Sequence, residues 1–85
     1  MRVDKFSKEL KTFVKDAMSL NTDESVSYEV DGTHYNLAVT ADNDGFNCEL
    51  LYSPNGVDDI KECAFVNKDK VGEIPTVIEY FMNCI

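Results

Sequence analysis

The sequence has no tryptophan, a single histidine, and three cysteines that lie far apart from one another. Cys48, Cys63 and Cys84 form no CxxC pair, which disfavours a disulfide framework and a zinc site. We therefore expect each cysteine to be a small buried hydrophobic side chain in a reducing cytoplasm. No cofactor is expected, because the chain has neither a glycine-rich phosphate loop nor a metal-ligand spacing.

Long hydrophobic runs are also missing. No apolar stretch approaches the roughly 20 residues that a membrane-spanning helix needs, so we expect no membrane contact. The first residues lead into an amphipathic pattern, so we expect no signal peptide and a cytoplasmic location. The 85 residues suffice for one domain, 1–85, with a modest core. A deep catalytic cleft would be costly in so small a core, which argues against an enzyme.

Positive charge is absent from the middle of the chain. Residues 16–60 contain ten acids and no lysine or arginine, within a net charge of −8. Residues 1–15, by contrast, contain five bases and two acids. Ten uncompensated acids would repel phosphates, so we do not expect nucleic acid to bind directly. The asymmetry instead favours a basic protein as the partner.

The hydrophobic spacing predicts a helix near each end of the chain. Apolar residues recur every three or four positions across residues 4–20, with lysines between them. Asp4 is the expected N-cap of this amphipathic helix, and Asn21 is its expected stop. A second helix is expected from Ile74 to the end of the chain, with Pro75 in its first turn.

Between these helices, apolar and polar residues alternate, which predicts antiparallel strands. Turn residues at 31–32 and 42–45 separate three such strands into a meander. A fourth strand is expected at 60–66, and a charged loop at 67–73. The inward face of the fourth strand stays ambiguous, because its apolar residues occupy both faces. They are Cys63 and Phe65 on one, and Ile60, Ala64 and Val66 on the other.

The two turns predict how the strands pair. A two-residue loop at 31–32 would place Tyr28 opposite Tyr35 and Val26 opposite Leu37. A four-residue loop at 42–45 would pair Ala41 with Phe46, Val39 with Cys48, Leu37 with Leu50, and Tyr35 with Tyr52. These registers put the apolar residues on one face of the sheet, so turn chemistry and hydrophobic pattern agree.

The expected fold is therefore an α+β two-layer sandwich in the order α-β-β-β-(β)-α. Its sheet would be an antiparallel meander of three or four strands, with both helices packed on one face. The other face would be open to solvent. On that face Ala38 and Leu51 form a small apolar spot with a polar rim. The spot would count as a binding surface only if the fourth strand added Ile60 or Phe65.

His34, which is expected opposite Glu29 on the open face, is the first of two candidates for chemistry. An imidazole beside a carboxylate can serve acid–base catalysis, but it is equally an ordinary cross-strand pair. No activated nucleophile stands beside it: Ser27 lacks an activating motif, and Cys48 should point the other way. We therefore expect no catalytic residue.

The second candidate is the segment 40–45, which resembles part of a calcium-binding loop because its oxygen ligands precede a glycine. Position twelve of such a loop would be Leu51, where a bidentate glutamate is needed. The flanking elements are predicted strands instead of helices. The same residues are what a hairpin turn requires, so no metal is expected.

These observations favour a small acidic binding protein. One hypothesis is an inhibitor that imitates nucleic acid and blocks a basic nucleic-acid-binding protein. In size, charge and general architecture the chain is similar to acidic proteins of phages and mobile elements that block restriction or CRISPR effectors. No motif aligns with such a family. On this hypothesis the partner-binding residues are Asp23, Glu24, Glu29, Asp31, Asp42, Asp44, Glu49, Asp58 and Asp59.

The alternative hypothesis is a non-enzymatic protein-interaction module. Examples are an immunity protein that neutralises a toxin, a secretion-type chaperone, or a homodimeric adaptor. In such a module a few apolar anchors supply the affinity, and charge mainly raises the association rate. The chain would act as a monomer or a homodimer in either case.

Overall fold

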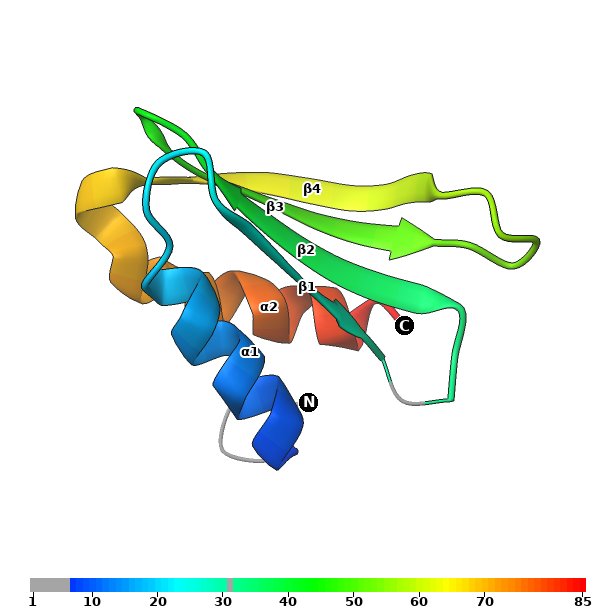
Figure 1. The fold of residues 1–85 in the computed structure, drawn as a ribbon. Helices are drawn as coiled ribbons and strands as arrows, with labels where there is room; N and C mark the ends of the chain where they lie inside the picture. Colours follow the sequence, from blue (N-terminus) through cyan, green and yellow to red (C-terminus); the bar gives the residue numbers. More distant parts are fainter. Residues whose placement is uncertain (1–6, 31) are drawn as a thin grey trace.

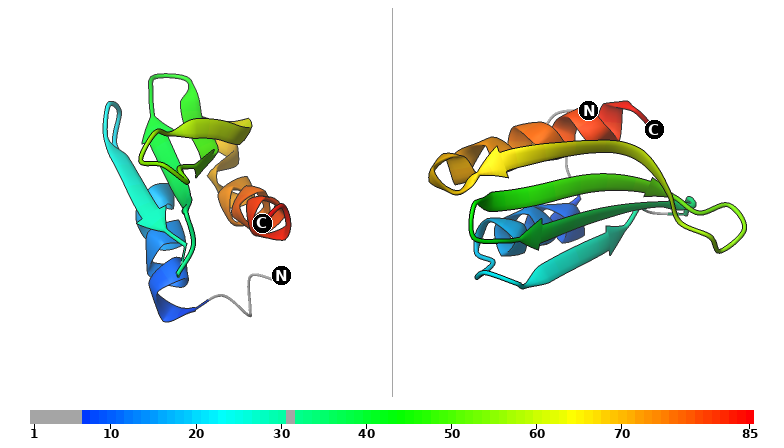
Figure 2. Two further views of the ribbon diagram at one scale, coloured as in Figure 1. Left: turned by 90° about the vertical axis from the view of Figure 1, so that its right-hand side faces the viewer. Right: turned by 90° about the horizontal axis from the view of Figure 1, so that it is seen from above.

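The computed structural model of this protein describes residues 7–30 and 32–85. In chain order the elements are α1 (Lys8–Met18), β1 (Ser25–Glu29), β2 (Tyr35–Ala41), β3 (Gly45–Tyr52), β4 (Asp59–Asn67), η2 (Lys68–Glu73) and α2 (Ile74–Asn83). The strands form one antiparallel sheet in the order β1-β2-β3-β4. Both α-helices lie below the same face of this sheet (Figures 1 and 2). The predicted α+β sandwich is confirmed, with four strands.

Helix α1 begins at residue 8 instead of residue 4, because Ser7 caps it. The side-chain oxygen of Ser7 accepts a hydrogen bond from the backbone N–H of Leu10 at 3.1 Å. Such a bond satisfies one of the N–H groups that the first helical turn leaves unpaired. The predicted cap, Asp4, lies outside the described residues. The helix ends at Met18, so Asn21 lies in the following loop and does not stop it.

The register between β2 and β3 is the predicted one. The observed pairs include Ala41 with Phe46, Val39 with Cys48, Leu37 with Leu50, and Tyr35 with Tyr52. The turn between these strands is closed by the side chain of Asp42. Its Oδ1 accepts the backbone N–H groups of Asp44 at 2.8 Å and of Gly45 at 2.9 Å. The turn residues therefore act as the sequence indicates.

The register between β1 and β2 differs from the prediction. Tyr28 lies opposite Leu37 instead of Tyr35, and Val26 lies opposite Val39 instead of Leu37. The strands are thus shifted by two residues. Side chains alternate between faces with a period of two, so this shift leaves each side chain on its predicted face.

Thr33 explains the shift, because it extends the connection beyond residues 31–32. Its hydroxyl donates to the carbonyl of Val30 at 3.1 Å and accepts the backbone N–H of Tyr35 at 3.2 Å. The backbone N–H of Val30 then donates to the carbonyl of Tyr35 at 2.9 Å. A four-residue connection, instead of a two-residue turn, therefore joins these strands.

Strand β4 is slightly longer than the predicted segment 60–66, and a β-bulge decides which way it faces. Val66 is 2% exposed and points into the core, whereas Phe65 is 48% exposed and points outward. Between β3 residues Leu50 and Leu51 the pairing slips by one residue on β4. Ile60 consequently shares the outer face with Phe65, although the two are five positions apart. Without the bulge they would lie on opposite faces.

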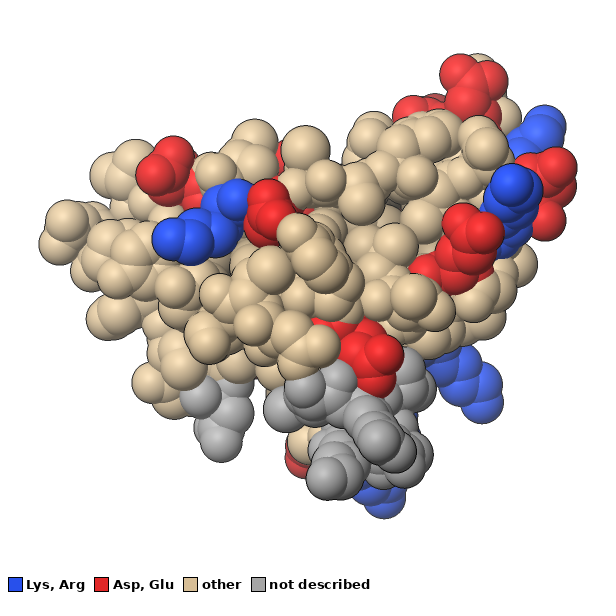
Figure 3. All heavy atoms as spheres, turned by 180° about the vertical axis from the view of Figure 1, so that it is seen from behind, with Lys and Arg blue, Asp and Glu red and all other residues tan. Residues whose placement is uncertain are grey.

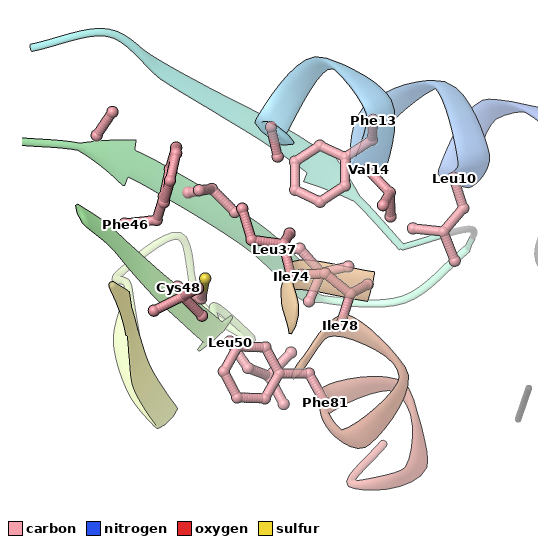
Figure 4. Close-up of a cluster of buried hydrophobic side chains, with 14 of the residues drawn as sticks. Leu10, Phe13, Val14, Leu37, Phe46, Cys48, Leu50, Ile74, Ile78 and Phe81 are labelled. Atoms are coloured by element: carbon pink, nitrogen blue, oxygen red, sulfur yellow. The ribbon is translucent and has the colours of Figure 1, made fainter. Parts of the chain in front are cut away.

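The core lies between the sheet and the two helices (Figure 4). Phe81 and Ile78 of α2, and Leu37 and Leu50 of the sheet, are completely buried. Helix α1 contributes four buried side chains: Leu10, Phe13, Val14 and Ala17.

The C-terminal part of the chain is more ordered than predicted. Residues 68–73, predicted as a charged loop, form the 3-10 helix η2, and α2 follows directly with Pro75 in its first turn. Tyr80 of α2 donates a hydrogen bond to Glu62 of β4 at 2.6 Å. This bond, together with the negative charge of Glu62, raises the pKa of Tyr80 to about 12.

No helix in residues 7–30 and 32–85 is long and apolar enough to cross a membrane.

Gly45, at the start of β3, leaves no room for a side chain beside β4. A Cβ atom at this position would collide with the carbonyl oxygen of Val66 and lie 2.9 Å from Cζ of Phe65. We expect Gly45→Ala to lower the free energy of unfolding by about 1–3 kcal/mol, because the strands must move apart. Gly72→Ala is the matched control, since no heavy atom lies within 4 Å of a Cβ there. Urea unfolding of both variants measures the difference, and equal stabilities would contradict this packing.

Candidate functional site on the open face of the sheet

The face opposite α1 and α2 carries three rows of side chains that run across all four strands. From β1 to β4 the rows are Glu29, Asn36, Leu51 and Ile60; then Ser27, Ala38, Glu49 and Cys63; then Ser25, Thr40, Asn47 and Phe65. Strands β1 and β2 contribute mainly hydroxyl and amide groups. Strand β4 contributes only apolar side chains to these rows. The face therefore changes from polar to apolar towards β4.

We call Leu51, Ile60, Cys63 and Phe65 the apolar column. Ile60 is 59% and Phe65 48% exposed, which is high for side chains of this size. The ring of Phe65 lies beside Gly45 and therefore covers the start of β3. The column extends the small spot predicted from Ala38 and Leu51. Both residues on which that prediction depended, Ile60 and Phe65, face outward.

Four predicted partner-binding acids, the turn-end acids, lie at one end of the sheet. They are Asp23, Glu24, Asp42 and Asp44. Asp23 and Glu24 flank β1, and hydrogen bonds between their backbone groups and Ala41 at 2.9 Å attach them to the end of β2. Asp42 and Asp44 follow Ala41 in the next turn. All four side chains are exposed to solvent.

Two of these carboxylates have structural roles. Asp42 closes its turn through two backbone N–H groups, and Oε1 of Glu24 accepts the backbone N–H of Asn21 at 2.8 Å. The oxygen that a calcium loop would direct at the metal therefore faces its own backbone. No group of three metal-ligating side chains occurs in the described part of the chain. Removing Asp42 or Glu24 would disturb a turn as well as a charge.

Three more predicted acids, the loop-end acids Glu29, Asp58 and Asp59, lie at the other end of the sheet. Asp58 accepts a hydrogen bond from the hydroxyl of Ser53 within the β3–β4 loop. This loop encloses a shallow hollow of about 370 Å³. Its lining combines apolar and acidic groups: Tyr52, Pro54, Asn55, Val57, Asp58 and Asp59.

The structure thus brings the predicted acids together in two groups. Strand β3 lies between the groups, and the seven steps between its eight residues span about 23 Å at about 3.3 Å per step. Glu49 lies between the groups in the middle row, and Asp31 lies outside the described residues. Figure 3, seen from the side of β4 and α2, shows acidic side chains at several separate places: at the upper right, on the right and left beside lysines or arginines, and in the lower middle.

The described lysines form no ion pairs with these acids. Among residues 7–30 and 32–85, none of the eight described site acids forms an ion pair with a lysine. The α1 lysines Lys8, Lys11 and Lys15 are exposed on the helical layer, whose apolar side faces the sheet. Lys61 is the one lysine on the described strands, at β4, where its Nζ lies 5.9 Å from the centre of the Tyr52 ring.

The predicted pairing of His34 with Glu29 is wrong. Glu29 lies opposite Asn36, because the β1–β2 register is shifted by two residues. His34 lies in the connection after β1, where its carbonyl accepts the backbone N–H of Ser53 at 2.9 Å. No carboxylate–imidazole pair is therefore formed by these two residues.

No family model matches the chain, and no curated protein and no solved structure is significantly similar to it. The geometry of the open face and its acids is therefore the basis for inferring what the protein does.

The cysteines test the facing of β4. The expectation that all three are buried is wrong, because Cys63 is exposed on the apolar column. Cys48 is buried, and burial raises the pKa of its thiol to about 11. At pH 8 we expect a thiol reagent to modify Cys63 of the folded protein first, and Cys48 only after unfolding. Mass spectrometry of the labelled peptides gives the order, and protection of Cys63 would mean that β4 faces the other way.

Proposed function

We propose that this chain is a small, acidic, non-enzymatic binding protein that docks the open face of its sheet onto a basic protein. One observation supports this proposal most directly. An exposed apolar column runs along the same face whose two ends carry exposed carboxylates. An apolar centre flanked by charge is the usual composition of a protein-binding surface.

The apolar column would supply most of the affinity. Complete burial of a large aliphatic or aromatic side chain contributes about 1.5–3 kcal/mol. Ile60 and Phe65 are already about half buried in the free protein, so a partner would gain roughly half of that from each. Leu51 adds a smaller amount. Together they support a moderate affinity that the surrounding polar residues would make specific.

The acids would determine which partners approach. The turn-end and loop-end acids lie on exposed turns, where a cationic surface can reach them. Charge of this kind steers the encounter and raises the association rate, and salt screens it over about 8 Å at physiological ionic strength. The complementary partner would have an apolar centre between two basic regions.

Mimicry of nucleic acid is the second candidate, and the absence of ion pairs between the described site acids and lysines favours it. The spacing of the acids favours it less. Over about 23 Å a DNA strand presents about seven phosphates, at 3.4 Å each. The open face offers only Glu49 between its two acidic groups. An interaction module with steering charges therefore accounts for more of this surface.

Binding measurements on two matched variants test the proposal. Protein captured from a lysate of the source organism would be identified, purified and titrated at about 50 and about 300 mM salt. We expect Ile60→Ser/Phe65→Ser to weaken binding about tenfold or more at both salt concentrations, because the column supplies affinity. Asp44→Asn/Asp58→Asn should weaken it mainly at low salt. Ile85→Ser, at a 43% exposed position that follows α2 on the helical layer, is the control.

The opposite pattern would support the mimic. In that case the column variant would bind normally, the acid variant would lose binding, and a DNA or RNA duplex would displace the protein. A partner that tolerates both variants would contradict both candidates. Circular dichroism and thermal unfolding confirm that each variant keeps its fold.

A further inference from the structure

Strand β4 has a long free edge. It is the last strand of the sheet and spans nine residues, whereas the opposite edge strand β1 spans five. In antiparallel pairs, every second residue bonds to the neighbouring strand and the others direct their backbone groups away from it. The backbone N–H of Lys68 donates to the carbonyl of Asp44 at 3.1 Å. This bond fixes the pattern, so Cys63, Phe65 and Asn67 direct their N–H and C=O groups to the free edge.

A free edge of this length is a template for another strand, and proteins usually protect such an edge by keeping the strand short or with charged side chains, proline or a β-bulge. Strand β1 is protected in this way, because Asp23, Glu24 and Glu29 flank it with no base between residues 16 and 60. Strand β4 and the start of η2 are balanced instead. They contain three acids and three bases: Asp59, Glu62, Asp69, Lys61, Lys68 and Lys70.

Figure 3 shows this side of the molecule. Uncharged residues cover most of it, lysines or arginines lie beside acids on its left and right, and a further acidic group lies in its lower middle. A second copy of a chain with net charge −8 is repelled by most of the surface. The β4 side is where that repulsion is weakest among the described edges of the sheet.

The sequence of β4 is also complementary to itself. When two copies run antiparallel with Phe65 opposite Phe65, Cys63 lies opposite Asn67. Both belong to the residues with outward backbone groups, so about six backbone hydrogen bonds form between the copies. In the same register Glu62 of each copy comes beside Lys68 of the other, which is the first residue after β4. Opposite charges across a strand pair stabilise it.

We infer that two copies of this chain pair antiparallel through β4, centred on Phe65, and form one continuous eight-stranded sheet. The two apolar columns then lie side by side at its centre, and the acidic ends lie outside them. The inference does not require the proposed function, because the oligomeric state is measured without a partner. If both hold, the binding surface is twice as large as in a monomer.

Sedimentation equilibrium of the purified chain, from about 5 to about 500 µM at about 150 mM salt, tests the pairing, because edge contacts of this size are weak to moderate. We expect a monomer–dimer equilibrium for the wild type. Glu62→Lys should weaken the dimer about tenfold, since it places Lys beside Lys68 twice. Lys68→Glu should weaken it similarly. The double variant Glu62→Lys/Lys68→Glu should restore it.

Recovery of the dimer in the double variant would show that the Glu62–Lys68 contact between copies matters, and not a change in the fold of each copy. Glu62→Lys also removes the hydrogen bond from Tyr80, and the double variant does not recover that bond. Asp16→Lys is the control of equal charge change, on the exposed side of α1 far from β4. A wild type that stays monomeric throughout would overturn the inference. So would a dimer that tolerates both single variants, because it would use another surface.

Discussion

Burial of only one face of the sheet is the constraint on which the rest of this structure depends. Two short helices cover the inner face, and the fully buried side chains of Leu37, Leu50, Ile78 and Phe81 meet there. The alternation of a strand then sends every other side chain to the opposite face. The composition of the open face therefore depends on the core, because the side chains of each strand that do not point into the core point to the open face.

The β-bulge modifies this rule at a single place. It lets Ile60 and Phe65, which are five positions apart, share the open face, while Val66 and Ala64 fill the core side. The bulge thereby places apolar side chains along the outermost strand. Asp42 and Glu24 lie at one end of the sheet because their carboxylates accept backbone N–H groups of the turns there. Packing and turn formation thus explain the apolar column and part of one acidic end.

Much of the fold could be predicted from the sequence. Both helices and the β2–β3 register follow from hydrophobic periodicity and turn chemistry, which agree at residues 42–45. The β1–β2 register could not be predicted, because it depends on hydrogen bonds from the side chain of Thr33. The facing of β4 depends on a bulge that leaves no mark in periodicity. The acidic residues could be identified from the sequence, but their division into two groups depends on how the strands pair. The sequence therefore predicted which residues belong to the candidate site but not how they are arranged in space.

The two-residue shift between β1 and β2 has a consequence for how this chain can vary. Because the sides of a strand alternate, lengthening or shortening the connection by two residues keeps Val26 and Tyr28 turned towards the helices. A change of one residue would turn both towards water and expose α1. Natural variants of this fold are thus expected to differ in the length of that connection by even numbers of residues.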